Sequence, residues 1–125
     1  MENFDLKAEL LSTLKSSEIL KKQVDGGFHN LVADDVVPLP RIIYQELDNN
    51  DSDFLDNKPT GSFVRFQVSI YCNHENIGRQ TTIAKEVDRL MKSIGYVRYD
   101  SIDLYEEDTG LFHKPMRYSK KLYSQ

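Results

Sequence analysis

The stretch NIGRQTTIAKEVDRLMKSIGYVRYDSIDLY, residues 76–105, joins a long helical pattern to the strand that follows it. Its apolar residues recur with the 3.6-residue period of a helix: Ile83, Ala84, Val87, Leu90, Met91 and Ile94. The residues between them predict a solvated face: Lys85, Glu86, Asp88, Arg89, Lys92 and Ser93. The helix should end at Gly95, because glycine readily takes the left-handed conformation that closes helices. The residues from Tyr96 to Tyr99 then predict a strand that packs back beside the helix, so this unit should form half of the core.

The composition predicts one soluble domain over residues 1–125. The chain is 39% hydrophobic and 29% charged, which is ordinary for a globular protein of this length. A net charge of −4 argues against general binding to nucleic acid or to a membrane surface. A single cysteine, Cys72, excludes an internal disulfide. The acidic first five residues do not resemble an export signal, and no apolar run approaches about 20 residues, so we expect a cytoplasmic, unsecreted protein.

The first half of the chain predicts helices, then a strand, then a loop. Leucines spaced on one side predict a helix from Asp5 to Lys15, and Ser17 can cap a second short helix. A brief strand is predicted at Phe28–Val32 and a longer one at Arg41–Leu47. Residues 48–62 are rich in Asp, Asn, Ser, Pro and Gly, which predicts a long flexible loop, and such loops are usually functional or disordered.

The second half predicts three strands around the central helix. Apolar residues alternate strictly from Phe63 to Cys72, which predicts a strand with one buried face. The alternation slips near Asp100–Ser101, where we expect a bulge or bend, and Asp108–Gly110 predicts a hairpin turn. The last strand should run from Leu111 to Tyr123. Because Pro115 cannot donate a hydrogen bond, this strand should lie at a sheet edge or be locally bulged there.

These elements together predict an α+β domain. The expected order is α-(α)-(β)-β-β-α-β-β, with a mainly antiparallel sheet of about four to five strands. The N-terminal helix and the long central helix should pack on this sheet.

No pattern in the sequence indicates catalysis, a metal or a cofactor. A calcium loop that started at Asn49 would have Phe54 where the sharp turn needs glycine and Thr60 where it needs glutamate. Cys72 and His74 are two residues apart, but no second cysteine exists to complete a zinc site. We therefore expect a protein that is not an enzyme and has no cofactor.

The charges indicate two candidate interaction surfaces. Residues 100–108 hold five acids and no base, whereas residues 111–125 hold four bases and no acid. This pattern is typical of cross-strand ion pairs, and it is also compatible with an acidic and a basic surface that meet between subunits. The acidic loop is the second candidate surface. The candidate interaction residues are Asp51, Asp53, Phe54, Asp56, Lys114, Arg117, Lys120 and Lys121.

The arrangement of segments from about Leu6 to Leu122 resembles a known family. The segments are the N-terminal leucine helix, PLPRIIY (38–44), FQVSIY (66–71), IAKEV (83–87), GY (95–96) and YEEDTGLFHK (105–114). Together they resemble the tail completion proteins of long-tailed phages and prophages, which join head to tail and are similar to tail terminators. The unusually acidic loop departs from that pattern.

The resemblance implies a structural protein that forms a ring at the head-proximal end of the tail tube. Its expected partners are other copies of itself, the tail tube protein and the head connector or head-closure protein. It also implies assembly in the host bacterial cytoplasm, then a place in the virion tail or neck. The loop at residues 49–61 would project from the domain, line the ring or reach the connector.

Three other functions remain open on the sequence. The chain could be a different neck or tail-tube protein, which would share the structural class. It could be a small α+β enzyme or ligand-binding domain that uses Tyr71, Cys72 or His74, and such a domain needs a concave pocket. Nucleic-acid binding through residues 114–121 would require a basic surplus that the whole chain lacks.

Overall fold

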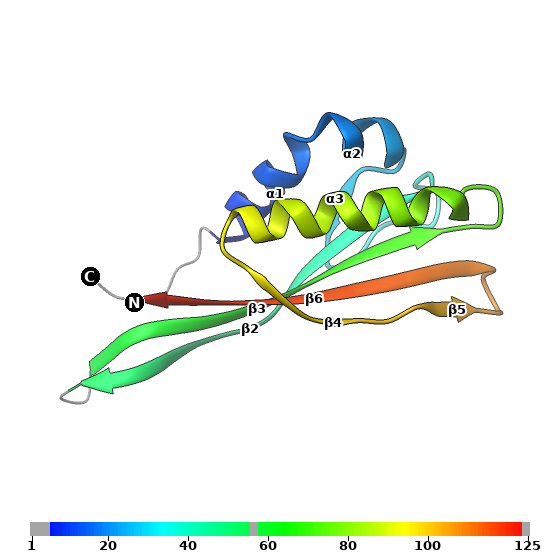
Figure 1. The fold of residues 1–125 in the computed structure, drawn as a ribbon. Helices are drawn as coiled ribbons and strands as arrows, with labels where there is room; N and C mark the ends of the chain where they lie inside the picture. The colour runs from blue at the N-terminus through cyan, green and yellow to red at the C-terminus, as the bar shows by residue number, and fades with distance from the viewer. Residues whose placement is uncertain (1–5, 56–57, 124–125) are drawn as a thin grey trace.

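The helices of this protein cover one face of a twisted sheet (Figure 1). The computed structural model describes residues 6–55 and 58–123, and it describes only the backbone of 50–55, 58–60, 62 and 123. The helices are α1 (Leu6–Lys15), α2 (Glu18–Gln23) and α3 (Gln80–Ser93), with a short 3₁₀ helix, η1 (Ile77–Arg79), before α3.

The sheet has six strands in the order β1-β2-β3-β6-β4, and β5 also pairs with β6. The strands are β1 (Phe28–Asn30), β2 (Arg41–Leu55), β3 (Lys58–Cys72), β4 (Val97–Ser101), β5 (Leu104–Glu106) and β6 (Leu111–Tyr123). Only the β1–β2 pair is parallel among the described pairs. The predicted α+β class is therefore confirmed, with one strand more than the upper end of the expected range.

The core lies between α3 and the helix-facing side of the sheet. Val64, Phe66, Val68 and Ile70 of β3 are fully buried, as their alternation predicted. The apolar stripe of α3 packs against them, with Ile83, Val87 and Met91 also fully buried. Gly95 ends this unit with φ +94°, so the predicted left-handed glycine is confirmed.

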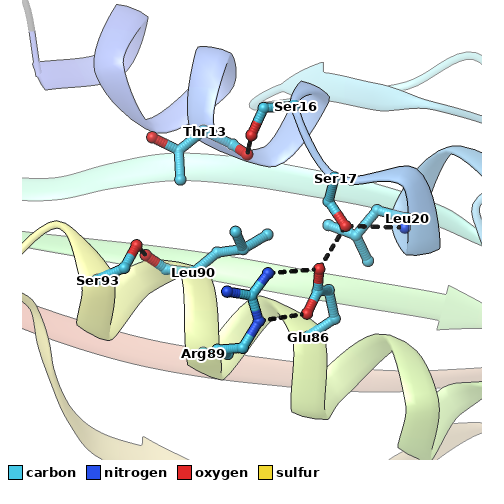
Figure 2. Close-up of polar contacts among 8 residues, drawn as sticks. All are labelled: Thr13, Ser16, Ser17, Leu20, Glu86, Arg89, Leu90 and Ser93. Carbon is cyan, nitrogen blue, oxygen red and sulfur yellow. Dashed lines mark hydrogen bonds and ion pairs between the residues drawn. The ribbon is translucent and has the colours of Figure 1, made fainter.

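A buried polar contact joins α2 to α3 (Figure 2). The Ser17 hydroxyl accepts a hydrogen bond from the Leu20 amide and donates one to Glu86 Oε2 at 2.5 Å. Arg89 donates two hydrogen bonds to the same carboxylate, at 2.8 and 2.9 Å. Glu86 is only 6% exposed, so its predicted place on the solvated face of the helix is wrong. The cause is tertiary: α2 covers that part of α3.

Within the loop predicted over residues 48–62, residues 48–55 instead continue β2 and residues 58–62 belong to β3, while residues 56–57 lie outside the described residues. The two strands pair from Arg41↔Tyr71 to Leu55↔Lys58, with a bulge between Glu46 and Asp48. The sequence is poor in residues that favour strands, but paired backbones satisfy each other's hydrogen bonds whatever the side chains are. Residues 48–55 and 58–62, named here the β2–β3 arm, extend beyond the helices (Figure 1).

The prediction that β6 is an edge strand is wrong, because β6 lies between β3 and the β4–β5 side. The alternative prediction of a bulge at Pro115 is not met either, because Ser101↔Met116 and Leu104↔His113 keep one register on the two sides of Pro115 and β3 pairs through it without a shift. The ladder breaks between Ser101 and Leu104, and the Ile102 amide donates to the Pro115 carbonyl across the break at 3.3 Å. Pro115 has no N–H to donate, and it lies opposite residues 102–103, where the β4–β5 side of the ladder is interrupted.

The bend and the turn in the C-terminal half are also confirmed. The β4–β6 register shifts between Arg98 and Asp100, next to the predicted bend. Gly110 follows β5 in the left-handed conformation with φ +69°. The exposed edges of the sheet are therefore β1 on one side and β4 with β5 on the other.

Candidate interaction surface

The four predicted basic residues of β6 do not form one surface. Lys114 and Lys120 share the helix side of the strand, whereas Arg117 and Lys121 lie on the opposite face, because side chains alternate along a strand. Lys114 Nζ lies 2.8 Å from Asp103 Oδ1, and Arg117 Nη1 lies 3.6 Å from Asp100 Oδ2. Cross-strand ion pairing therefore accounts for much of the charge pattern in the sequence.

Lys120 has a role within the fold. Its ammonium group donates a hydrogen bond to the Ile94 carbonyl at 2.6 Å, where α3 ends. It also lies 5.4 Å from the centre of the Tyr96 ring and 3.9 Å from Glu9. A cation at this place satisfies a terminal helix carbonyl and complements the helix dipole.

Three of the candidates from the acidic segment fall on the β2–β3 arm. Asp51, Asp53 and Phe54 belong to β2, where only their backbone is described, and Asp56 lies outside the described residues. The described part of β6 ends at Tyr123, which pairs with Gly61, and among the described residues Lys58 and Pro59 pair with β2 and not with β6. The arm thus begins within a three-stranded region and continues as a two-stranded ribbon.

The β4–β5 edge exposes apolar side chains that the sequence reasoning did not select. Val97 is 65% exposed, and the other members are about half exposed: Tyr99, Ile102, Leu104 and Tyr105. Amphipathic aromatic and aliphatic groups on an unpaired strand edge are typical of interaction surfaces. The sequence did contain one signal for this exposed edge, which is the slip in the alternation at residues 99–102. After such a slip, the apolar side chains of the strand no longer all lie on its buried face.

A polar cavity of about 160 Å³ lies between α3 and the strands β4 and β6. We name it the cationic recess and define it by Thr81, Lys85, Asp88, Arg98 and Lys114. Burial raises the pKa of Asp88, but hydrogen bonds from Lys92 and Tyr118 and the charge of Arg98 outweigh it and lower the pKa. Asp88 is therefore ionised at neutral pH. No pattern in the sequence could reveal this recess, because its residues come from three separate elements.

The residues of the alternative enzyme hypothesis do not converge. Cys72 is fully buried on the helix side, and burial raises the pKa of its thiol to about 11, so it is a poor nucleophile. Tyr71 lies on the opposite face and stacks on His113 at 4.2 Å between ring centres. His74 contacts Tyr105, with 3.1 Å between the ring nitrogen and the hydroxyl oxygen.

The two cavities that we describe are lined by other side chains. One is the cationic recess, and the other, of about 230 Å³, lies beside Asp35, Leu39, Arg41, Thr109 and Leu111. In the part of the chain that the structure describes, no cluster of three or more His, Cys, Asp or Glu side chains could hold a metal ion. Within the same residues, no helix is long and apolar enough to cross a membrane.

The fold has a counterpart among solved structures. A chain described as "Virion of native gene transfer agent (GTA) particle" matches with a TM-score of 0.62. The match covers 95% of this chain and 95% of that chain, at 12% sequence identity. No protein-family model matches the sequence. No curated protein matches it either. At this identity the likeness establishes a shared fold.

Proposed function

We propose that this chain is a structural protein of a phage or prophage that completes the tail and joins it to the head connector. It would form a ring at the head-proximal end of the tail tube, after assembly in the host cytoplasm. The observation that carries this proposal is the fold shared over nearly the whole of both chains with a component of a gene transfer agent virion. The ordered segments of the sequence that resemble tail completion proteins support the same role.

The surface of the molecule is consistent with an assembly role. The β4–β5 edge exposes apolar side chains, and the β2–β3 arm extends beyond the helices (Figure 1). A small domain that worked alone would gain nothing from an exposed apolar edge, which is an aggregation hazard unless a partner covers it.

Deletion of the gene tests the proposal. Tails would be purified from host cells with and without this protein and compared by negative-stain electron microscopy. We expect overlong or headless tails in its absence, and we expect that expression of the wild-type chain from a second locus restores normal particles. Normal virions from the deletion strain would overturn the proposal.

A second structural role is supported by the same likeness. The chain could instead be a head-closure protein or a tail-tube subunit, since a shared fold does not determine the position in the particle. A tube subunit should polymerise alone at moderate concentration, whereas a completion protein should add to preformed tails. Sedimentation of the purified chain with and without tails distinguishes the two.

A further inference from the structure

Exposed apolar side chains gather at the two edges of the sheet. In the part of the chain that the structure describes, seven of the ten exposed large hydrophobic side chains lie there. Two of them, Leu31 and Val32, directly follow β1 and are 55% and 77% exposed. An apolar sheet edge invites pairing with another chain, so a partner should cover it. The other five lie on the β4–β5 side: Val97, Tyr99, Ile102, Leu104 and Tyr105.

The outer side of β1 has free backbone groups. The Gly27 carbonyl accepts a hydrogen bond from β2 at 3.0 Å, and the Leu31 amide donates one to β2 at 2.9 Å. Successive residues of a strand point their backbone groups to opposite sides, so those of Phe28 and Asn30 point away from β2. The Asn30 carbonyl accepts from the Val32 amide at 2.8 Å. Both groups of Phe28 and the Asn30 amide remain for an added strand.

The outer side of β4 has free backbone groups too. The Ile102 amide donates to the Pro115 carbonyl of β6 at 3.3 Å. Bonded and unbonded residues alternate in an antiparallel pair, so the backbone groups of the preceding residue, Ser101, point away from β6. Among the described strands, none pairs with β4 on this outer side. Each edge of the sheet can therefore accept a strand of another molecule.

The two free edges lie at the same height along the strands. One row of paired residues crosses the sheet from Asn30 through Tyr44, Val68 and Met116 to Ser101. A ring places its copies at one height around its axis. If that axis runs along the strands, rotation brings Asn30 of one copy beside Ser101 of the next.

The strand directions also suit pairing between copies. β1 runs parallel to β2, and each later neighbour in the order β2-β3-β6-β4 is antiparallel. β1 and β4 therefore run in opposite directions. Rotation about an axis along the strands keeps these directions, so β1 of one copy would meet β4 of the next as an antiparallel pair. Antiparallel pairing is the more stable arrangement per residue.

We propose that the β1 edge of one copy binds the β4 edge of the next copy, so that the sheet continues from subunit to subunit. This proposal rests on the proposed ring and names the contact that closes it. Asn30 lies opposite Ser101 in the contact, and the same register brings the exposed Val32 to the exposed Tyr99. Two different surfaces meet, so the association is head-to-tail, which is the arrangement that produces rings.

Engineered disulfides test the register. Asn30→Cys and Ser101→Cys each place a thiol at one exposed edge position, and the native Cys72 is fully buried and stays unchanged. The two variants would be mixed and oxidised at high protein concentration. We expect dimers with one chain of each variant, identified by mass spectrometry from linked peptides that contain positions 30 and 101. The matched control mixes Ser101→Cys with Ser12→Cys, which is exposed on α1. If the 30–101 link forms no faster than the 12–101 link, the proposal is overturned.

Lysine substitutions test whether two different edges meet. In Val32→Lys and in Tyr99→Lys we expect the self-association measured by sedimentation velocity to weaken at least about tenfold, because the contact would bury an unpaired charge. Ile19→Lys makes the same change in charge at an exposed apolar residue on α2, and it should associate like wild type. Each edge variant keeps one intact edge, so a mixture of the two should recover dimers and no larger species.

Three results would overturn the head-to-tail contact. Weakening in only one edge variant would show that two like edges meet. Equal weakening in Ile19→Lys would show that the association does not depend on the edges. A wild-type chain that stays monomeric at its highest soluble concentration would show no contact at all.

The outcomes separate this contact from the proposed function. Overlong tails in the deletion strain without the 30–101 link would keep the function and remove the contact. The 30–101 link together with normal virions in the deletion strain would keep the contact and remove the function.

Discussion

The Ser17 hydroxyl contributes to two helices at once, and its removal should affect both. In Ser17→Ala, α2 loses its N-cap acceptor and the buried Glu86 loses a donor. We expect the free energy of unfolding to fall by about 1–3 kcal/mol, measured by urea denaturation. Ser16→Ala removes only an exposed hydroxyl that donates to the Thr13 carbonyl, and it should change stability by less than about 0.5 kcal/mol. Equal losses in the two variants would contradict this role of Ser17.

The Glu86 carboxylate should make the fold sensitive to acid. Hydrogen bonds from Arg89 lower its pKa most, and the Ser17 hydroxyl and the Arg89 charge act in the same direction against burial. A carboxyl with a lowered folded pKa stabilises the fold above its unfolded pKa of about 4.3, and that stability is lost as the pH falls through the folded value. For the wild type, we expect the urea concentration at the unfolding midpoint to decrease as the pH is lowered below about 5. The Glu86→Gln variant should be less stable at pH 7 and less dependent on pH below 5. If the stabilities of the wild type and of Glu86→Gln change with pH in parallel, the Glu86 carboxylate is not the source of the acid sensitivity.

At the scale of elements, the α3–β4 connection depends on Gly95. Its φ of +94° suits glycine, and an added Cβ would lie 3.1 Å from Lys120 Cε. That lysine also binds the Ile94 carbonyl, so it cannot move away without losing the helix-end contact. We expect Gly95→Ala to reduce the free energy of unfolding by about 1–2 kcal/mol.

Gly78→Ala is the matched control for this element, because nothing lies within 4 Å of an added Cβ there and its φ is not left-handed. We expect its melting temperature to match or exceed that of the wild type, since alanine restricts the unfolded chain. If the two variants lose the same stability in thermal denaturation, the backbone conformation of Gly95 is not the cause.

At the scale of the whole molecule, the outer part of the β2–β3 arm should be dispensable for folding. Replacing residues 53–60 by Asn-Gly, together with Asp51→Asn, removes the outer arm and keeps the pairs from Gly61 to Cys72 with β6. Because the core lies under the helices, we expect a melting temperature within about 5 °C of the wild type, measured by circular dichroism. A shortened chain that is unfolded at room temperature would show that the arm belongs to the folding unit.

The elements that the sequence predicted correctly are those fixed by local patterns. The alternation of β3, the stripe of α3, the glycine after it and the turn before Leu111 each follow from side chains close together in the chain. The capping of α2 by Ser17 could also be predicted from the sequence, because an N-cap serine binds a backbone amide only three residues farther along the chain.

The tertiary structure alone decided the length of the arm, the interior position of β6, the burial of Glu86 and the cationic recess. Each depends on elements distant in sequence: a backbone ladder extends β2 and β3 through residues that disfavour strands, and the β4–β5 break accommodates Pro115. Glu86 is buried because α2 folds over α3, and the recess exists because α3, β4 and β6 meet. The sequence by itself therefore determined where the main helices and strands form, since propensity and periodicity are local. Packing decided which of their side chains are covered and which are offered to another molecule, since burial depends on the neighbours that the fold supplies.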